Sequence, residues 1–162
     1  MRLEDAEKIA AGIVETIKPF SEKVEVAGSI RRKRPEIRDI DIVLIPKPFS
    51  WDLIIHRLCY HDPAQLIKQG PKLATVSLPV GISVDLYVAT PETLGVLLLI
   101  RTGSKEHNIR LCSLARSKGL MLSAARGVIQ DGKVIASRTE AEIFTALGLA
   151  YVKPEDRECE DL

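Results

Sequence analysis

Apolar residues recur at helical spacing in two segments of the first half of the chain. Between residues 3 and 18 they fall at every third or fourth position, and Pro19 then stops the run. This pattern predicts an amphipathic helix with one face against a core. Residues 51–60 repeat the pattern behind Ser50, a residue type that caps helices, and predict a second helix.

A period of two replaces the helical period in three other segments. Residues 23–28 alternate and end in glycine, and residues 39–46, DIDIVLIP, are rich in β-branched side chains and bounded by proline. Residues 73–89 read as two strands joined at residues 79–81. Residues 1–90 therefore predict a small sheet with helices packed against it.

The second half of the chain is mainly helical in pattern. We expect helices over residues 90–103, where Thr90 is the expected cap, over residues 105–120 and over residues 139–149. The turn QDG at residues 130–132 predicts a hairpin.

The pattern changes near residue 90 without a linker, which divides the 162 residues into 1–90 and 91–162. A chain of this length suffices for one compact unit, or for two small lobes that share a core. The predicted fold class is α+β, with a small mixed sheet that has helices on one side, followed by a small α/β subdomain.

Charge is balanced in total but not along the sequence. The chain has 23 basic and 22 acidic residues, yet basic side chains concentrate in residues 31–38 and 101–110, and acids in residues 154–162. This segregation is typical of a face that meets phosphates, and also of an ordinary solvated surface.

Compartment and redox state are constrained by what the sequence contains. No apolar run approaches the about 20 residues of a membrane-spanning helix, and the acidic, amphipathic amino terminus is unlike a secretory signal. We expect a cytoplasmic, intracellular protein without a membrane partner, at the nucleoid if it is prokaryotic. Cys59, Cys112 and Cys159 form no C-x-x-C pair, and we expect free thiols.

Three aspartates carry the strongest chemical signal. Asp39 and Asp41 project from the same side of a predicted strand, and Asp85 lies within another strand. If the two strands pair, three carboxylates converge and repel one another, a cost that a divalent cation reverses. Mg²⁺ suits such oxygen ligands, and two ions about 3.5 to 4 Å apart can clamp the attacking and leaving oxygens of a phosphoryl transfer.

A glycine turn precedes these acids. Gly28 and Ser29 follow a predicted strand and supply backbone N–H groups and a hydroxyl, which suit an anion. Arg32 lies three residues after Ser29, within reach of the same anion, and its planar fork can bond two phosphate oxygens.

The Gly-Ser turn, the arginine, the D-x-D pair and the later aspartate together resemble the palm of the nucleotidyltransferase superfamily. Residues 101–123, RTGSKEHNIRLCSLARSKGLMLS, with residues 139–144 and 147–158, narrow the match to the thumb and carboxyl terminus of family X DNA polymerases. The resemblance runs from the first helix to Glu158. It implies a nucleotidyltransferase palm at residues 1–90 and a thumb at residues 91–162.

The resemblance also implies roles for individual residues. Asp39, Asp41 and Asp85 would be catalytic and would bind two Mg²⁺ ions, with Mn²⁺ as a substitute, and Lys105 and Arg110 would contact DNA. In the nucleotide site, Ser29 and Arg32 would bind the β and γ phosphates, with Gly28 shaping the turn. A Thr-Gly pair would lie under the sugar, and an asparagine would reach the minor groove of the nascent pair. These nucleotide-binding residues are Gly28, Ser29, Arg32, Thr102, Gly103 and Asn108.

A monomeric DNA polymerase is the implied enzyme. It would add nucleotides from nucleoside triphosphates to a primer 3′-OH on primer-template or gapped DNA, release pyrophosphate, and fill short gaps in DNA repair. Family members usually carry amino-terminal lyase and helix-hairpin-helix regions, whereas this chain resembles only the palm and thumb. We therefore expect no lyase chemistry and a smaller DNA footprint.

The chain departs from the family pattern just before T-G-S. Ile100 and Arg101 stand where family members commonly have aromatic residues that crowd the 2′ side of the sugar, so we expect weak discrimination against ribonucleotides. The alternatives are a template-independent enzyme, a nucleotidyltransferase acting on a small molecule or RNA, and a catalytically silent nucleic-acid-binding module.

Overall fold

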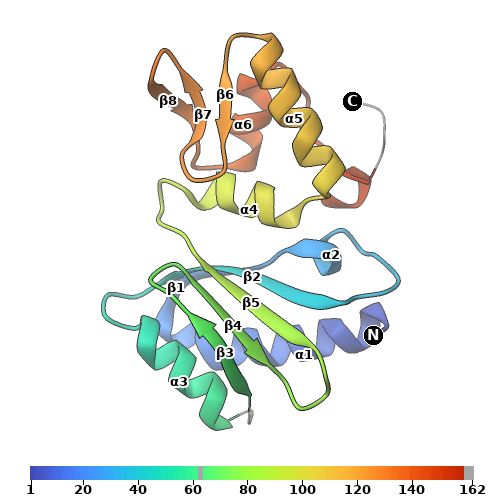
Figure 1. Cartoon of the computed structure of the whole chain (residues 1–162), viewed down its shortest axis with the longest axis vertical. Helices are drawn as coiled ribbons and strands as arrows, with labels where there is room; N and C mark the ends of the chain where they lie inside the picture. The colour runs from blue at the N-terminus through green and yellow to red at the C-terminus, as the bar shows by residue number, and fades with distance from the viewer. Residues whose placement is uncertain (62–63, 159–162) are drawn as a thin grey trace.

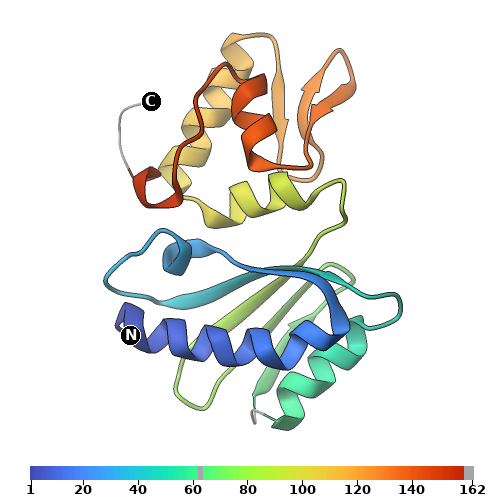
Figure 2. The same cartoon turned by 180° about the vertical axis from the view of Figure 1, so that it is seen from behind.

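The structure is a computed structural model that describes residues 1–61 and 64–158. Two parts are stacked along the long axis, with a five-stranded sheet in one, a three-stranded sheet in the other and α4 between them (Figures 1 and 2). The helices are α1 (Leu3–Ile17), α2 (Gly28–Arg31), α3 (Trp51–His61), α4 (Leu94–Thr102), α5 (Lys105–Ser117) and α6 (Glu140–Ala146), with 3₁₀ turns at Lys18–Phe20 and Pro154–Asp156. The strands are β1 (Ser21–Val26), β2 (Asp39–Pro46), β3 (Gln65–Gln69), β4 (Leu73–Ser77), β5 (Ser83–Val88), β6 (Met121–Ser123), β7 (Gly127–Gln130) and β8 (Lys133–Ala136).

The larger sheet is mixed, with the strand order β1-β2-β5-β4-β3. Its central pair, β2 and β5, runs parallel, while the other neighbouring pairs are antiparallel. Because side chains alternate along a strand, β2 sends Ile40, Ile42 and Leu44 to one face of the sheet and Asp39 and Asp41 to the other.

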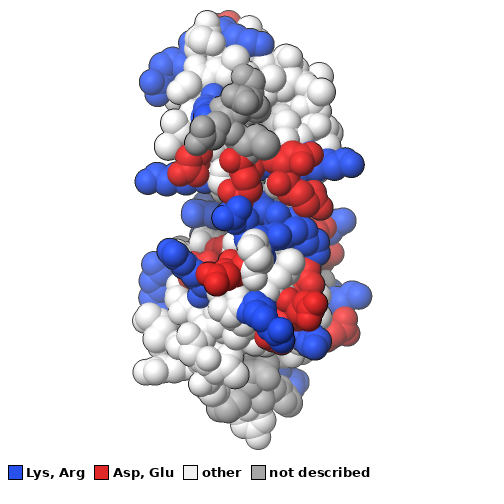
Figure 3. All heavy atoms as spheres, turned by 90° about the vertical axis from the view of Figure 1, so that its right-hand side faces the viewer, with Lys and Arg blue, Asp and Glu red and all other residues white. Residues whose placement is uncertain are grey.

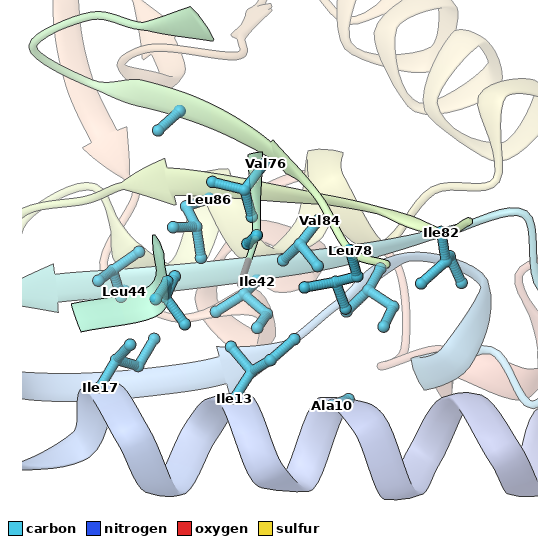
Figure 4. Close-up of a cluster of buried hydrophobic side chains, with 14 of the residues drawn as sticks. Ala10, Ile13, Ile17, Ile42, Leu44, Val76, Leu78, Ile82, Val84 and Leu86 are labelled. Carbon is cyan, nitrogen blue, oxygen red and sulfur yellow. The ribbon is translucent and has the colours of Figure 1, made fainter. Parts of the chain in front are cut away.

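The apolar face of this sheet is covered by α1 and α3 (Figure 2). Ile13 and Ile17 of α1 point toward Ile42 and Leu44 of β2 in Figure 4, and all four side chains are almost fully buried. Burial of each such side chain contributes about 1.5–3 kcal/mol. This core therefore holds the central strands in place from the face that α1 and α3 cover.

The opposite face carries the junction with the second part. Val43 and Ile45 of β2 pack with Ala89 and with Leu98 of α4, so α4 lies on the same face as the aspartates. A separate core joins α4, α5 and α6 to the three-stranded sheet β6-β7-β8. A Cβ at Gly95 would lie 2.4 Å from the Thr139 backbone nitrogen, so only glycine allows α4 this close to the start of α6.

The α+β class, the amphipathic first helix and the hairpin after residue 127 are confirmed. One predicted boundary is wrong: α4 begins at Leu94, because Thr90 and Thr93 form a turn in which the Thr90 N–H donates to Thr93 Oγ1 at 3.0 Å. Two strands went unpredicted. β3 is an edge strand exposed throughout, and β6 has three residues, so neither shows a readable alternation.

Two of the three cysteines lie in the described part of the chain. Cys59 and Cys112 are free and half-buried, and Cys159 lies outside the described residues. Within residues 1–61 and 64–158, no helix has the length and apolar character needed to cross a bilayer.

Candidate active site

The register of β2 and β5 brings the acids from two distant segments together. Asp41 is the direct partner of Asp85 in the parallel pair, and Asp39 is the partner of Ser83. Side chains at paired positions in neighbouring strands share a face of the sheet. The three aspartates therefore lie on the sheet face opposite α1, with Asp39 exposed and Asp41 and Asp85 half-buried.

Asp41 lies where burial and neighbouring negative charges oppose its ionisation. Burial, and then the negative charges of Asp39 and Asp85, raise the pKa of Asp41 to about 7. The Tyr87 hydroxyl donates to Asp41 Oδ1 at 3.4 Å, and the Arg101 guanidinium carbon lies 4.1 Å from the centre of the Tyr87 ring. The bond from Tyr87 and the positive charge of Arg101 partly offset this rise in the pKa of Asp41.

Asp85 has a different partner. Thr75 of β4 lies opposite Asp85 in the antiparallel pair, and its hydroxyl donates to Asp85 Oδ1 at 2.5 Å. Among the described residues, no three His, Cys, Asp or Glu side chains are so arranged that they could hold a metal ion. Asp39 and Asp41 face the cleft, whereas Asp85 is held toward β4. The donor set suits Mg²⁺, provided that Asp85 exchanges its bond with Thr75 for the ion.

The glycine turn lies directly against Asp41. Gly28 opens the short helix α2 with φ of 61°, and a Cβ added at this position would lie 2.0 Å from Asp41 Oδ2. A side chain here would therefore displace the carboxylate, and the backbone conformation itself favours glycine. The turn at Gly28 and Ser29 and the acid pair form one continuous surface.

A cleft of about 720 Å³ lies between this surface and the second part of the molecule. Ile109, Cys112, Ser113 and Arg116, which sequence reasoning did not assign to the site, also line it. Arg110 is not among its lining residues. The predicted site residues that line the cleft are Gly28, Ser29, Arg32, Asp39, Asp41, Thr102, Gly103, Lys105 and Asn108.

The far wall of the cleft is the turn between α4 and α5. The Ser104 hydroxyl accepts a bond from the His107 N–H at 3.2 Å and donates to the Arg157 carbonyl at 2.7 Å, which fixes the start of α5. Asn108 donates from Nδ2 to the Ile100 carbonyl at 2.9 Å, and its buried Oδ1 accepts from no described residue. The turn is thus rigid on the side away from the cleft.

Two consecutive arginines at the end of α2, Arg31 and the following Arg32, tie the two parts together. Arg31 donates to both carboxylate oxygens of Glu140, at 2.9 and 2.6 Å, and to the Thr102 hydroxyl at 2.8 Å. Arg157, which is fully buried, donates to the same Glu140 at 2.5 Å. Burial opposes ionisation of Glu140, but its bonds and charge pairs with the two arginines outweigh burial and lower its pKa.

Arg32, the next residue, turns toward the cleft instead. Its Nε donates to Glu158, and its Nη1 donates to the Thr102 carbonyl. Figure 3 shows the result from the side on which α2 lies in Figure 1: basic side chains form a band across the middle of the molecule, between acidic groups. The predicted phosphate ligand therefore already has a carboxylate partner.

His107 of α5 is a buried histidine. Its side chain is 1% exposed and packs against Phe144, with ring centres 6.0 Å apart, and neither ring nitrogen has a partner among the described residues. The helical position gave no indication of this, because Phe144 comes from α6. Burial, followed by the charge of Arg157, lowers the pKa of His107 to about 4.

This buried histidine predicts a specific loss of stability in acid. The unfolded chain binds a proton at His107 below pH 6.5, but the folded chain resists it until about pH 4. As the pH is lowered from 6.5 to about 4, the free energy of unfolding should fall by about 3 kcal/mol more in the wild type than in His107→Leu. Urea unfolding of both proteins from pH 7 to pH 4 measures this difference. Parallel curves would show that His107 does not titrate in this way.

Residues 97–158 match the family described as DNA polymerase beta thumb. Together with the relatives below, this match indicates that the chain is similar to family X DNA polymerases.

Three curated relatives share parts of the chain. It is 30% identical to the DNA polymerase/3′-5′ exonuclease PolX of Bacillus subtilis over 157 residues, 93% of this chain and 27% of that protein. DNA polymerase lambda of Rattus norvegicus is 32% identical over 85 residues, 46% of this chain and 15% of that protein. DNA polymerase IV of Saccharomyces cerevisiae is 34% identical over 76 residues, 47% of this chain and 13% of that protein. The chain thus spans about a quarter of PolX and less of the other two.

Several residues around the acids were not found from the sequence. Tyr87 follows Asp85 by two positions, so strand alternation alone places both on one face and gave a usable signal. Thr75, by contrast, reaches Asp85 only through the pairing of β4 with β5. Glu158 and Arg32 lie 126 positions apart, and no local pattern connects them.

Proposed function

We propose that this chain carries the nucleotidyl-transfer site of a DNA polymerase of the family X type. The observation that carries the proposal is that Asp41, which lines a large cleft directly beside the Gly28 turn, is paired with Asp85 of the neighbouring strand. Carboxylates and an anion-binding turn in contact suit a substrate that brings phosphates and divalent ions together.

In the proposed reaction, the primer 3′ oxygen attacks the α phosphorus of a nucleoside triphosphate. The bond from that phosphorus to the bridging oxygen breaks, pyrophosphate leaves, and the proton of the 3′ hydroxyl passes to solvent. Asp39, Asp41 and Asp85 are the residues that would hold Mg²⁺, which when bound neutralises charge on the phosphates and favours ionisation of the hydroxyl.

The remaining work is positioning. Ser29 and Arg32 would hold the β and γ phosphates, Thr102 and Gly103 would lie under the sugar, and Asn108 would face the base pair. Lys105, exposed at the start of α5, is placed at the cleft where a DNA phosphate could approach. Arg110 has weaker support, because it does not line the cleft. Short-gap filling in DNA repair by a monomer remains part of this proposal.

Primer extension by the purified chain tests the function directly. Single-stranded, nicked, gapped and primer-template DNA are offered with all eight nucleotides and with Mg²⁺ or Mn²⁺. The proposal expects extension that depends on the divalent ion and on the template base. Extension of single strands alone would indicate a template-independent enzyme, and extension of RNA ends alone an RNA nucleotidyltransferase. DNA binding without any transfer would indicate a silent binding module.

The same assay carries a prediction about the sugar. Arg101 is exposed and lies over the Tyr87 ring, and Ile100 packs toward the second core, so neither presents an aromatic ring to the cleft. A site that only tolerates an extra hydroxyl discriminates by less than about 100-fold. We therefore expect the ratio of kcat/KM for deoxynucleotides over ribonucleotides to lie below this limit. A ratio far above it in competition assays would reject this role for Ile100 and Arg101.

A further inference from the structure

The proposed phosphate ligand Arg32 is held by the carboxyl-terminal segment. Its Nε donates to Glu158 Oε1, and Arg34 Nε lies 3.8 Å from the same oxygen. Glu158 follows the 3₁₀ turn Pro154–Asp156 in the second part of the molecule, whereas Arg32 belongs to the glycine turn of the first. This contact therefore crosses the cleft boundary at the residue assigned to the nucleotide's phosphates.

The existing bonds restrict how Arg32 can bind a phosphate. A guanidinium offers two edges that each bond two oxygens, Nε with Nη2 and Nη1 with Nη2. Glu158 occupies the single N–H of Nε on the first edge, and Nη1, which belongs to the second edge, already donates to the Thr102 carbonyl. In the described part of the chain, Nη2 donates to no other residue. A two-point grip through the first edge therefore requires Glu158 to leave, and one through the second edge must share Nη1 with the Thr102 carbonyl.

Glu158 is the partner that can leave. Thr102 is fully buried, and its carbonyl belongs to the last turn of α4, which packs into two cores. The Glu158 side chain is 29% exposed and that of Arg32 16%, so water reaches the ion pair and can receive the carboxylate. A carboxylate that stayed beside Arg32 would also repel an incoming triphosphate.

We propose that Glu158 is an internal competitor for Arg32, which exchanges with the β and γ phosphates of a nucleotide and returns when pyrophosphate leaves. Glu158 thereby weakens binding of polyphosphates without touching the reacting atoms. A nucleoside monophosphate, which has no β or γ phosphate to reach Arg32, escapes this competition. The inference rests on the proposed function, since it depends on the assignment of Arg32 to phosphate.

Calorimetric titration of the full chain separates these effects. Magnesium pyrophosphate, a magnesium deoxynucleoside triphosphate and the matching monophosphate are titrated into the wild type, Glu158→Gln, Glu155→Gln and Arg32→Gln. Glu155 is the matched control, because it is an exposed carboxylate in the 3₁₀ turn that precedes Glu158. We expect Glu158→Gln to lower the Kd for both polyphosphates by about fivefold and to leave the monophosphate unchanged. The control should match the wild type.

Each other outcome has a definite meaning. Unchanged or weaker polyphosphate binding in Glu158→Gln, with normal binding in the wild type, overturns the inference alone; weaker binding would mean that Glu158 orients Arg32. Wild-type affinity in Arg32→Gln overturns the assignment of Arg32 and the inference with it. If neither the wild type nor Glu158→Gln binds any polyphosphate, the proposed function fails as well. Circular dichroism of each variant verifies that it is folded.

Discussion

Replacement of Asp41 by asparagine is expected to reduce primer extension by about 10²–10³-fold or more, while the protein stays folded. The amide side chain would keep the size of the carboxylate and could still accept a bond from the Tyr87 hydroxyl, but it would carry no charge for a divalent ion. The crowding that raises the pKa of Asp41 comes from burial and from Asp39 and Asp85, so loss of the charge also removes a repulsion. The free energy of unfolding should therefore stay the same or rise.

Single-turnover extension on gapped DNA, together with urea unfolding, measures both sides of this expectation. Asp131→Asn is the matched control: Asp131 is exposed in the β7–β8 turn, and its φ of 50° is one that asparagine tolerates well. The control should extend primers as the wild type does. A folded Asp41→Asn protein with wild-type turnover would remove Asp41 from the catalytic group.

The second large effect concerns stability. Glu140→Ala is expected to lower the free energy of unfolding by about 3–5 kcal/mol, because it leaves Arg157 charged, fully buried and without its carboxylate. Arg157 also lies over the rings of Phe144 and Tyr151, at 5.3 and 5.6 Å, so it cannot move to water without disturbing the second core. Arg31 loses its bidentate partner in the same change.

A matched surface pair shows whether the effect comes from burial. Lys33 and Glu7 also form an ion pair at 2.5 Å, but their side chains are 54% and 38% exposed. Glu7→Ala should therefore cost less than about 1 kcal/mol in the same urea titration. Arg157→Met removes the buried charge itself, so it should lower the free energy of unfolding much less than Glu140→Ala does. Equal losses of stability in Glu140→Ala and Glu7→Ala would contradict a stabilising role for the cluster of Arg31, Glu140 and Arg157.

Most of the secondary structure could be read from the chain, because periodicity is a local property. The DIDIVLIP segment alone indicates a strand with two acids on one face and apolar side chains on the other, and the structure has that arrangement. The exceptions are segments where the pattern is weak. The exposed strand β3 has no apolar face to reveal it, and the turn at Thr90 resembles a helix cap until its hydrogen bonds are known.

The sequence predicts only part of the candidate site. The residue types, with the glycine turn and the acids, favour phosphate and metal chemistry, but their meeting depends on β5 being inserted beside β2 in parallel register. Arg31 and Arg32 illustrate the limit. They are adjacent in the chain, yet Arg31 pairs with Glu140 and Arg32 with Glu158, at separations of 109 and 126 residues.

Local backbone geometry thus specifies which side chains share a face, since the repeat of a strand or helix is built into the covalent chain. It specifies neither the burial of His107 against Phe144 nor the carboxylate that holds Arg32. The first contact arises within the second part, between α5 and α6, and the second where the two parts meet. Many distant residues together set that packing. The elements and the candidate chemistry are therefore encoded locally, while the charges that tune the site come from the assembled fold.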